Sequence, residues 1–200
     1  MAVNLKKGQK ISLKKSNGHN LSSFCVGANW GAIEKNGFFG KRMESVDLDL
    51  SIGMFDGAKN LYRTVYFGNT SEAGIRHSGD DLTGDTSGDD GFDNEVIVVN
   101  LNEIPQHIEQ IVFVLNSYQG HDFATIPFAS IRLYEGTPRV VRDVVAKFNI
   151  SHDKRFSGYV SMILGKLYRR NGEWKFSAIG EPTQDRRLND TLTTVRQKFL

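Results

Sequence analysis

The chain has 200 residues and a mass of 22.4 kDa, the size of one domain or two very small ones. Hydrophobic residues make up 39% of the chain and charged residues 24%, a balance that supports a packed core and excludes a wholly disordered protein. The sequence has neither the roughly 20 consecutive apolar residues of a membrane helix nor the apolar segment of a secretory signal. Cys25 is the one cysteine, so no internal disulfide can form. These features predict a cytoplasmic protein.

The charges are distributed unevenly along the chain. The net charge is +2, from 25 Lys and Arg against 23 Asp and Glu, yet no Lys or Arg occurs from His77 to Ile131. Ten acidic residues fall in that stretch, and seven of them lie between Asp80 and Glu95. Like charges this close raise one another's pKa values. We therefore expect a compensating partner, and a bound cation is the obvious candidate.

The N-terminal half is predicted to form strands. Alternating or β-branched runs, typical of strands, cover residues 10–14, 23–30, 45–55 and 61–67. In the third run Asp47 and Asp49 alternate with aliphatic residues, so both aspartates should point away from the core. Residues 69–94 have almost no periodicity and are predicted to form a long ordered loop, which in a compact domain is usually functional or disordered.

The C-terminal half is also mainly strand-like. Apolar runs predict strands at residues 95–101, 111–117 and 129–134, and the Val-rich run 140–150 is ambiguous but suits a strand. Two further runs, 159–169 and 173–179, flank Asn171-Gly172, the strongest short hairpin signal. A type I′ turn there sets Arg170 opposite Glu173 and Arg169 opposite Trp174. Residues 183–200 carry apolar side chains at helical spacing, which predicts an amphipathic helix.

Many short strands separated by turns indicate a mainly β fold, an antiparallel β-sandwich with a long acidic metal-binding loop and a C-terminal amphipathic helix. We expect one sandwich domain over residues 1–182. The helix over residues 183–200 should be packed on this domain or appended to it.

The loop that follows Gly79 has the composition of a site for a hard divalent cation. Its carboxylates are interleaved with Gly79, Gly84 and Gly88, which can adopt the positive φ that turns several oxygens inward. This density of acids favours calcium, which takes six to eight oxygen ligands, over magnesium. The alternative is a solvated acidic loop that binds nothing specific. Asp47 and Asp49 would add two carboxylates whose oxygens could bind the cation, unless they form the polar outer face of an edge strand.

Other catalytic or metal-binding motifs are missing from the sequence. It has no Walker A motif, no G-x-G-x-x-G and no nucleophile elbow, and its five histidines lack zinc spacing. His77 stands either beside the metal or as a satisfied polar residue at a strand end. Cys25 is expected to be a small buried hydrophobe rather than a direct ligand.

Several segments resemble the TerD family of tellurite-resistance and general stress proteins. In matching order they are Val46-Asp47-Leu48-Asp49, the run RHSGDDLTG over residues 76–84, Gly88-Asp89-Asp90, and Glu95. Residues 156–158, 165–176 and 178–180 are similar to the last hairpin of that family. The resemblance extends from about residue 3 to residue 180 and covers nearly the whole chain.

This resemblance implies a β-sandwich whose acidic residues bind calcium at adjacent sites. The implied metal ligands are Asp47, Asp49, Asp80, Asp81, Thr83, Gly84, Asp89, Asp90 and Glu95, with Thr83 or Gly84 offering a backbone carbonyl. The family usually has Asn at the position of Asp81 and Gly at that of Thr86. Residues 91–94 interrupt its Asp-Asp-Glu run, and this insertion could shift Glu95 out of reach of the metal.

The leading functional hypothesis is a non-enzymatic calcium-binding module of a tellurite-resistance or chemical stress-response system. Calcium would order the acidic loop for contact with other stress-system proteins or with a membrane surface. The alternative is a metal-dependent phosphoester hydrolase using the same carboxylates, for which His77 is the one general base on offer.

A third hypothesis is an adaptor whose basic N-terminal region meets anionic lipid at the inner membrane face. The basic residues are Lys6, Lys7, Lys10, Lys14, Lys15, Lys35, Lys41 and Arg42. Because no aromatic residues are closely interleaved with them, specific nucleic-acid binding is not expected, and a solvated face is the simpler account.

Overall fold

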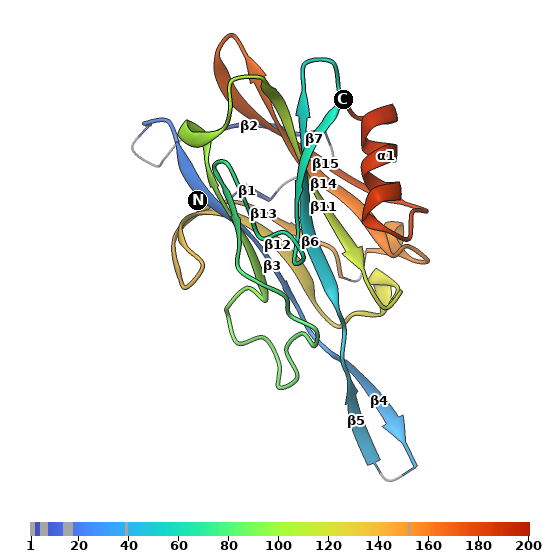
Figure 1. Ribbon diagram of the computed structural model, residues 1–200. Coiled ribbons are helices and arrows are strands. Elements are labelled where there is room, and N and C mark those ends of the chain that lie inside the picture. The colour runs from blue at the N-terminus through green and yellow to red at the C-terminus, as the bar shows by residue number, and fades with distance from the viewer. Residues whose placement is uncertain (1–2, 5–7, 14–17, 39, 152) are drawn as a thin grey trace.

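The computed structural model describes residues 3–4, 8–13, 18–38, 40–151 and 153–200. One sheet has the spatial order β1 (Val3–Asn4), β13 (Val140–Asn149), β12 (Ala129–Thr137), β3 (Ser23–Trp30), β10 (Glu95–Asn100), β9 (Ile75–His77), β8 (Ser71–Glu72). The other has the order β2 (Lys10–Ser12), β15 (Glu173–Thr183), β14 (Ser161–Arg170), β11 (Ile108–Ser117), β6 (Leu48–Asp56), β7 (Leu61–Val65). Helix α1 spans Leu188–Lys198 (Figure 1).

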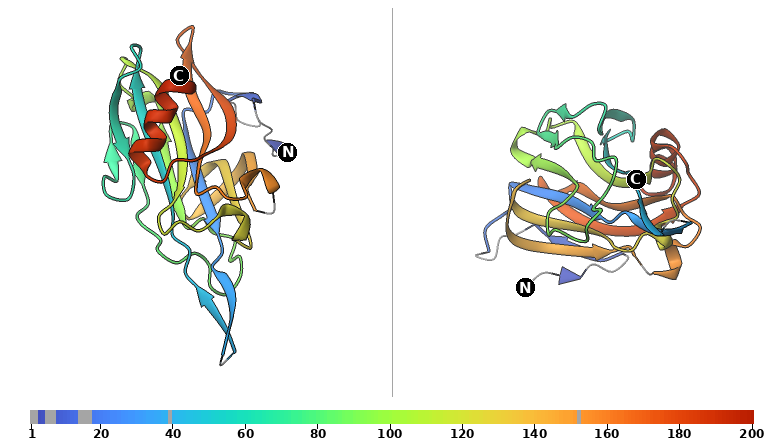
Figure 2. Two further views of the ribbon diagram at one scale, coloured as in Figure 1. Left: turned by 90° about the vertical axis from the view of Figure 1, so that its right-hand side faces the viewer. Right: turned by 90° about the horizontal axis from the view of Figure 1, so that it is seen from below.

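The two sheets pack face to face around one hydrophobic core, as the view from below in Figure 2 shows. Phe24 from β3, Leu50 from β6 and Phe113 from β11 all lie in that core and are fully buried. Strand pairs are antiparallel except for the parallel pair of β1 and β13. The predicted antiparallel sandwich is therefore confirmed, and the ambiguous run 140–150 is strand β13.

Helix α1 covers the outer face of the second sheet (Figures 1 and 2). Its Leu192 and Val195 are buried against Phe55 of β6, Val114 of β11 and Ile163 of β14. These central strands are thus apolar on both faces, because the core lies on one side and the helix on the other. The helix begins at Leu188 rather than at residue 183, since Thr183 still belongs to β15.

The β14–β15 hairpin has the predicted register. Asn171 and Gly172 have φ of 52° and 77°, as a type I′ turn requires, and Arg170 stands opposite Glu173 while Arg169 stands opposite Trp174. The Asn171-Gly172 turn, a local sequence signal, thus sets the register between β14 and β15, and β14 also pairs with β11 in the second sheet.

Two short strand pairs were not predicted. Strands β8 and β9 pair with each other within the run that was expected to be a loop. Strand β9 also joins the first sheet, where its buried Ile75 pairs with Val99 of β10. The other pair, β4 (Ile33–Gly37) and β5 (Gly40–Glu44), is a hairpin that projects from the sandwich (Figure 1). Most of its residues are exposed, so its sequence lacks the apolar alternation from which a strand could be predicted.

Part of the predicted basic N-terminal region also lies on this hairpin. Lys41 forms an ion pair with Glu34 at 2.8 Å, and Lys35 forms one with Glu44. Lys6, Lys7, Lys14 and Lys15 lie outside the described residues, as does the end of the strand expected over residues 10–14. The basic charge that the structure describes is thus partly neutralised by the hairpin's own acids.

Candidate metal centre

Three carboxylates from two distant segments converge at the start of β6. We call them the inner group: Asp47 just before β6, Asp49 on β6, and Asp80 on the loop after β9. One oxygen from each lies within 4.8 Å of the others. Asp47 and Asp49 are only 4% and 7% exposed, whereas Asp80 is exposed. The two strand aspartates therefore do not form a solvated outer face, which was the simplest alternative account of them.

The inner group is short of positive charge and of hydrogen bonds. The Oδ1 atoms of Asp47 and Asp49 are buried and have no hydrogen-bond partner in the described part of the chain. Burial, reinforced by the neighbouring acids, raises the pKa of Asp47 to about 6 and that of Asp49 to about 8. Buried carboxylates without donors or counter-charges are unfavourable, and a cation would satisfy both needs.

Glu95 lies behind the inner group as a fully buried residue of β10. Its Oε2 accepts a hydrogen bond from the amide of Leu50 at 2.7 Å, and its Oε1 accepts one from the amide of Asp81 at 3.4 Å. Burial raises the pKa of Glu95 despite these contacts. The structure therefore places Glu95 as a link between β10, β6 and the loop, outside the inner group.

His77 packs against Glu95 and has no exposed side-chain surface. Its Nε2 lies 3.4 Å from Glu95 Oε2 and 2.9 Å from the carbonyl oxygen of Leu50, while its Nδ1 accepts a hydrogen bond from the amide of Gly79 at 3.1 Å. Burial acts to lower the pKa of His77, but Glu95, together with the Leu50 carbonyl and Asp80, outweighs it and raises that pKa. His77 thus holds the start of the loop to the sheet.

A second set of carboxylates, the outer group, comprises Asp85, Asp89 and Asp90, whose oxygens also lie within 4.8 Å of one another. Asp85 is half-buried, and the other two are exposed. Loop amides already donate to all three: Asp90 N to Asp85 at 3.3 Å, Gly91 N to Asp89 at 2.8 Å and Phe92 N to Asp90 at 2.9 Å. The outer group is thus partly satisfied by its own backbone.

Asp81 and Thr83 shape the loop between the two groups and belong to neither of them. Asp81 Oδ1 accepts from the amides of Thr83 and Gly84, each at 2.9 Å, and these bonds outweigh burial and lower its pKa. The carbonyl of Thr83 accepts from the amide of Val46 at 3.0 Å. Gly84 has a φ of 66°, and a Cβ there would lie 2.6 Å from the Trp30 ring, so the position requires glycine.

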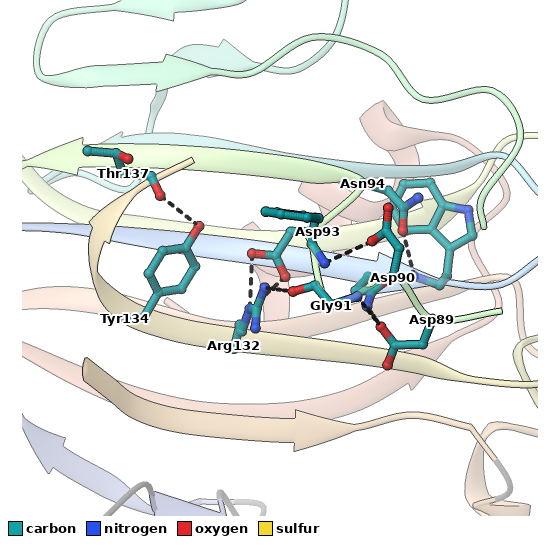
Figure 3. A network of polar contacts seen from close by, with 11 residues as sticks. Asp89, Asp90, Gly91, Asp93, Asn94, Arg132, Tyr134 and Thr137 are labelled. Atoms are coloured by element: carbon teal, nitrogen blue, oxygen red, sulfur yellow. Dashed lines mark hydrogen bonds and ion pairs between the residues drawn. The ribbon is translucent and has the colours of Figure 1, made fainter. Parts of the chain in front are cut away.

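Residues 91–94, which separate Asp90 from Glu95, fasten the loop to the first sheet (Figure 3). Arg132 of β12 donates through Nε to both oxygens of Asp93, at 2.8 and 3.1 Å, and through Nη2 to the carbonyl of Gly91 at 3.0 Å. Gly27 makes room for this pair, since a Cβ there would lie 2.0 Å from an Asp93 oxygen. This segment therefore anchors the loop.

Two asparagines, neither of them expected from the sequence, complete the anchoring. The side chain of Asn94 accepts from the amide of Trp30 at 2.8 Å and donates to Asp85 at 3.1 Å and Asp81 at 3.2 Å. Asn29 donates to Asp89 at 2.9 Å. Both were missed because neutral amides stand out less in a sequence than acids, although Asn94 lies within the acidic run itself.

The comparisons with known proteins agree with this architecture. The model of the TerD domain matches residues 1–194. The chain belongs to the TerD family. It is 36% identical to stress response protein SCP2 of Bacillus subtilis (strain 168), over 96% of this chain and 98% of that protein. It is 31% identical to tellurium resistance protein TerZ of Serratia marcescens, over 94% of each. The family membership predicted from the acidic motifs is confirmed.

A solved structure shows the same TerD fold. A homologue of the telluride resistance protein TerD from Streptomyces coelicolor A3(2) superposes with a TM-score of 0.67 at 14% sequence identity. The match covers 90% of this chain and 97% of that one. In the described part of this chain, no helix is long and apolar enough to cross a membrane.

Proposed function

We propose that this TerD-family protein is a non-enzymatic calcium-binding module of a tellurium-resistance and stress-response system. Calcium held by Asp47, Asp49 and Asp80 orders the acidic loop, which then presents a surface to a partner protein or a membrane. The observation that carries the proposal is the pair of buried, unpartnered carboxylate oxygens of Asp47 and Asp49 beside Asp80. The names of the relatives support the assignment to this system.

The choice of ion follows from the donor set. Calcium accepts many oxygen ligands in flexible geometry, whereas magnesium keeps most of its waters and uses one or two carboxylates. Three carboxylates within 4.8 Å, two of them buried, suit the ion that dehydrates readily. The outer group supplies a second and weaker calcium site, because its oxygens already accept hydrogen bonds from the loop.

Binding at the inner group couples the loop to the sandwich. Asp80 belongs to the loop, Asp49 to β6, and Asp47 directly precedes β6, so an ion shared by the three holds the two segments together. By linkage, an ion that binds only the folded arrangement stabilises it in proportion to the logarithm of its concentration. The ordered loop is then the calcium-dependent surface.

The same geometry favours a binding role over hydrolysis. A metal-dependent hydrolase needs a base that can take a proton from a water molecule. Both ring nitrogens of His77 are engaged, with Leu50 on one side and Gly79 on the other, and its side chain is fully buried. His77 therefore supports the proposal as a positioning residue of the loop.

Calorimetric titration of chelator-stripped protein, first with calcium and then with magnesium, tests the proposal. We expect saturable calcium binding and a larger rise in melting temperature with calcium than with equal magnesium. Asp80→Asn should weaken calcium binding, whereas Asp143→Asn, a charge-matched change on β13 of the other sheet, should not. The proposal fails if neither ion binds or if both substitutions have the same effect.

A further inference from the structure

A pocket of about 590 Å³ lies between the start of α1 and the outer face of the second sheet. Its walls come from β6, β11, the residues just after β7 and the segment that leads into the helix. The volume falls within the range of small-molecule sites, roughly 300–1,000 Å³. The chemistry of the pocket walls indicates what kind of ligand the pocket would bind.

One wall carries buried hydrogen-bonding groups that are left without partners. Ser51 Oγ and Asn116 Oδ1 belong to side chains only 1% and 4% exposed, and neither atom has a hydrogen-bond partner among the residues described. The amide nitrogen of Asn116 is fully used, since it donates to Ser161 Oγ at 2.6 Å and to Thr191 Oγ1 at 3.0 Å. A buried polar atom left unpaired costs about 1–3 kcal/mol, which a ligand hydroxyl or amine would recover.

The orientation of Asn116 is itself fixed. The hydroxyl of Thr191 donates to the carbonyl of Arg187 at 3.1 Å, so it can only accept from Asn116. The side-chain nitrogen of Asn116 therefore faces α1, and its oxygen is the atom left over on the pocket wall. The same bond ties the backbone of Arg187, at the opposite wall, to the helix.

The opposite wall is positively charged. Arg186 and Arg187 are exposed, and neither guanidinium forms an ion pair or hydrogen bond within the described ranges. Arg187 is also the N-cap of α1 and makes no side-chain capping bond, so the amides of Leu188 and Asn189 have no partner among the described residues, while the amide of Asp190 donates to the carbonyl of Arg187 at 3.0 Å. Two guanidinium groups at an uncapped helix N-terminus form a favourable site for a phosphate group.

The rim is aromatic. The ring of Tyr66 lies edge-on to that of Phe67 at 5.2 Å, and the ring of Phe67 lies edge-on to that of Tyr118 at 6.1 Å. Tyr118 is 68% exposed despite its size. Aromatic faces held in place by edge-on neighbours and open to solvent are suited to stacking against a flat ring.

From these two walls and the aromatic rim we infer that the pocket binds a phosphate monoester carried on a flat ring system. The phosphate would lie against Arg186 and Arg187, the ring against the aromatic rim, and a ligand hydroxyl would donate to Asn116. The inference goes beyond the proposed function, since none of these contacts needs a metal. The pocket touches the inner group only through Asp49, which lines both.

Calorimetric titration of the full chain with adenosine 5′-monophosphate tests this inference. It is run in chelator and repeated at saturating calcium, so that failure of the calcium site leaves the result readable. We expect one molecule bound per chain, with inorganic phosphate and adenosine each binding at least about tenfold more weakly. The variant Arg186→Ala with Arg187→Ala should weaken binding about tenfold or more, the loss expected when charge-assisted hydrogen bonds are removed.

Arg139→Ala with Arg142→Ala is the matched control, because it removes the same charge from the β12–β13 hairpin on the other sheet. It should leave the affinity unchanged, and Ser51→Ala should change it less than the arginine pair does. Circular dichroism confirms that each variant is folded. The inference is overturned if the nucleotide does not bind in either condition, if both arginine pairs weaken it equally, or if inorganic phosphate binds as tightly.

Discussion

The inner and outer groups each contain three aspartates with oxygens within 4.8 Å of one another, yet they are built in opposite ways. In the inner group Asp47 and Asp49 are buried, and each has an oxygen without a donor in the part of the chain described. In the outer group Asp89 and Asp90 are exposed and accept hydrogen bonds from their own loop. Burial raises the pKa of Asp47 to about 6 and that of Asp49 to about 8, and it also raises the pKa of the half-buried Asp85 in the outer group.

The comparison shows that acid density alone does not identify a metal site. A loop can satisfy its own carboxylates through turns, and the outer group does so. In the inner group the backbone does not satisfy the buried Oδ1 atoms of Asp47 and Asp49 in this way, and a bound cation is the partner that we propose for them. The predictions below change one group or its support at a time.

The largest effect should come from Asp49→Asn in chelator-treated protein. Burial raises the pKa of Asp49 from 3.8 to about 8, so near neutral pH the folded state holds a proton that the unfolded state has released. Removing this penalty should raise the free energy of unfolding at pH 7 by as much as about 4 kcal/mol. Urea denaturation measures the change. A destabilised variant would show that Asp49 is already satisfied without metal.

Breaking the anchor of the loop should change the free energy of unfolding by nearly as much. Arg132→Met removes the ion-pair partner of the Asp93 carboxylate, whose side chain is 1% exposed. Removing one member of a buried ion pair costs about 3–5 kcal/mol, and we expect a loss near the lower figure because Arg132 is 20% exposed. The exposed Arg142→Met on β13 is the control and should cost less than about 0.5 kcal/mol. Equal losses would mean that the anchor contributes nothing specific.

The pH dependence of stability should change sign with calcium. Without metal, the raised pKa values of Asp47 and Asp49 make the folded state bind protons more tightly, so stability should rise as pH falls from about 8 toward 4. With calcium, protons compete for the same oxygens, so the stabilisation should be greatest above pH 8 and fade through pH 6. Thermal melts across this range, with chelator and with calcium, measure both trends. Parallel profiles would contradict the account.

The smallest effect should come from the outer group. Asp89→Asn keeps an oxygen that can accept from Gly91 and Asn29, so the free energy of unfolding should change by less than about 1 kcal/mol in chelator. Its effect on calcium affinity should be smaller than that of Asp49→Asn, as calorimetry would show. A larger loss at Asp89 would reverse the ranking of the two groups.

Much of the fold could be predicted because strand alternation and turn chemistry are local signals. The alternation around Leu48 and Leu50 and the Asn171-Gly172 turn both correspond to observed structure. The β4–β5 hairpin gave no such signal, because its exposed side chains have no core to face. The start of α1 was misplaced because Thr183 ends a strand before the helix begins.

The site was harder to predict because long-range contacts form it. The family motifs drew attention to Asp47, Asp49 and Asp80, which the structure brings together. They gave no sign that the Asp81 and Glu95 carboxylates accept hydrogen bonds from loop amides. The anchor depends on contacts between residues far apart in sequence, Asp93 with Arg132 and Asn94 with Trp30, which only folding creates.

Trp30 offers the most direct test that the inner group is the calcium site. Its indole nitrogen donates to the carbonyl of Val46 at 2.7 Å, directly beside Asp47. Terbium prefers the same oxygen ligands as calcium and emits when a nearby tryptophan is excited. We predict tryptophan-sensitised emission that calcium displaces, that Asp49→Asn abolishes, and that Asp89→Asn and Trp174→Phe retain. Emission that survives Asp49→Asn but disappears with Asp89→Asn would contradict the account.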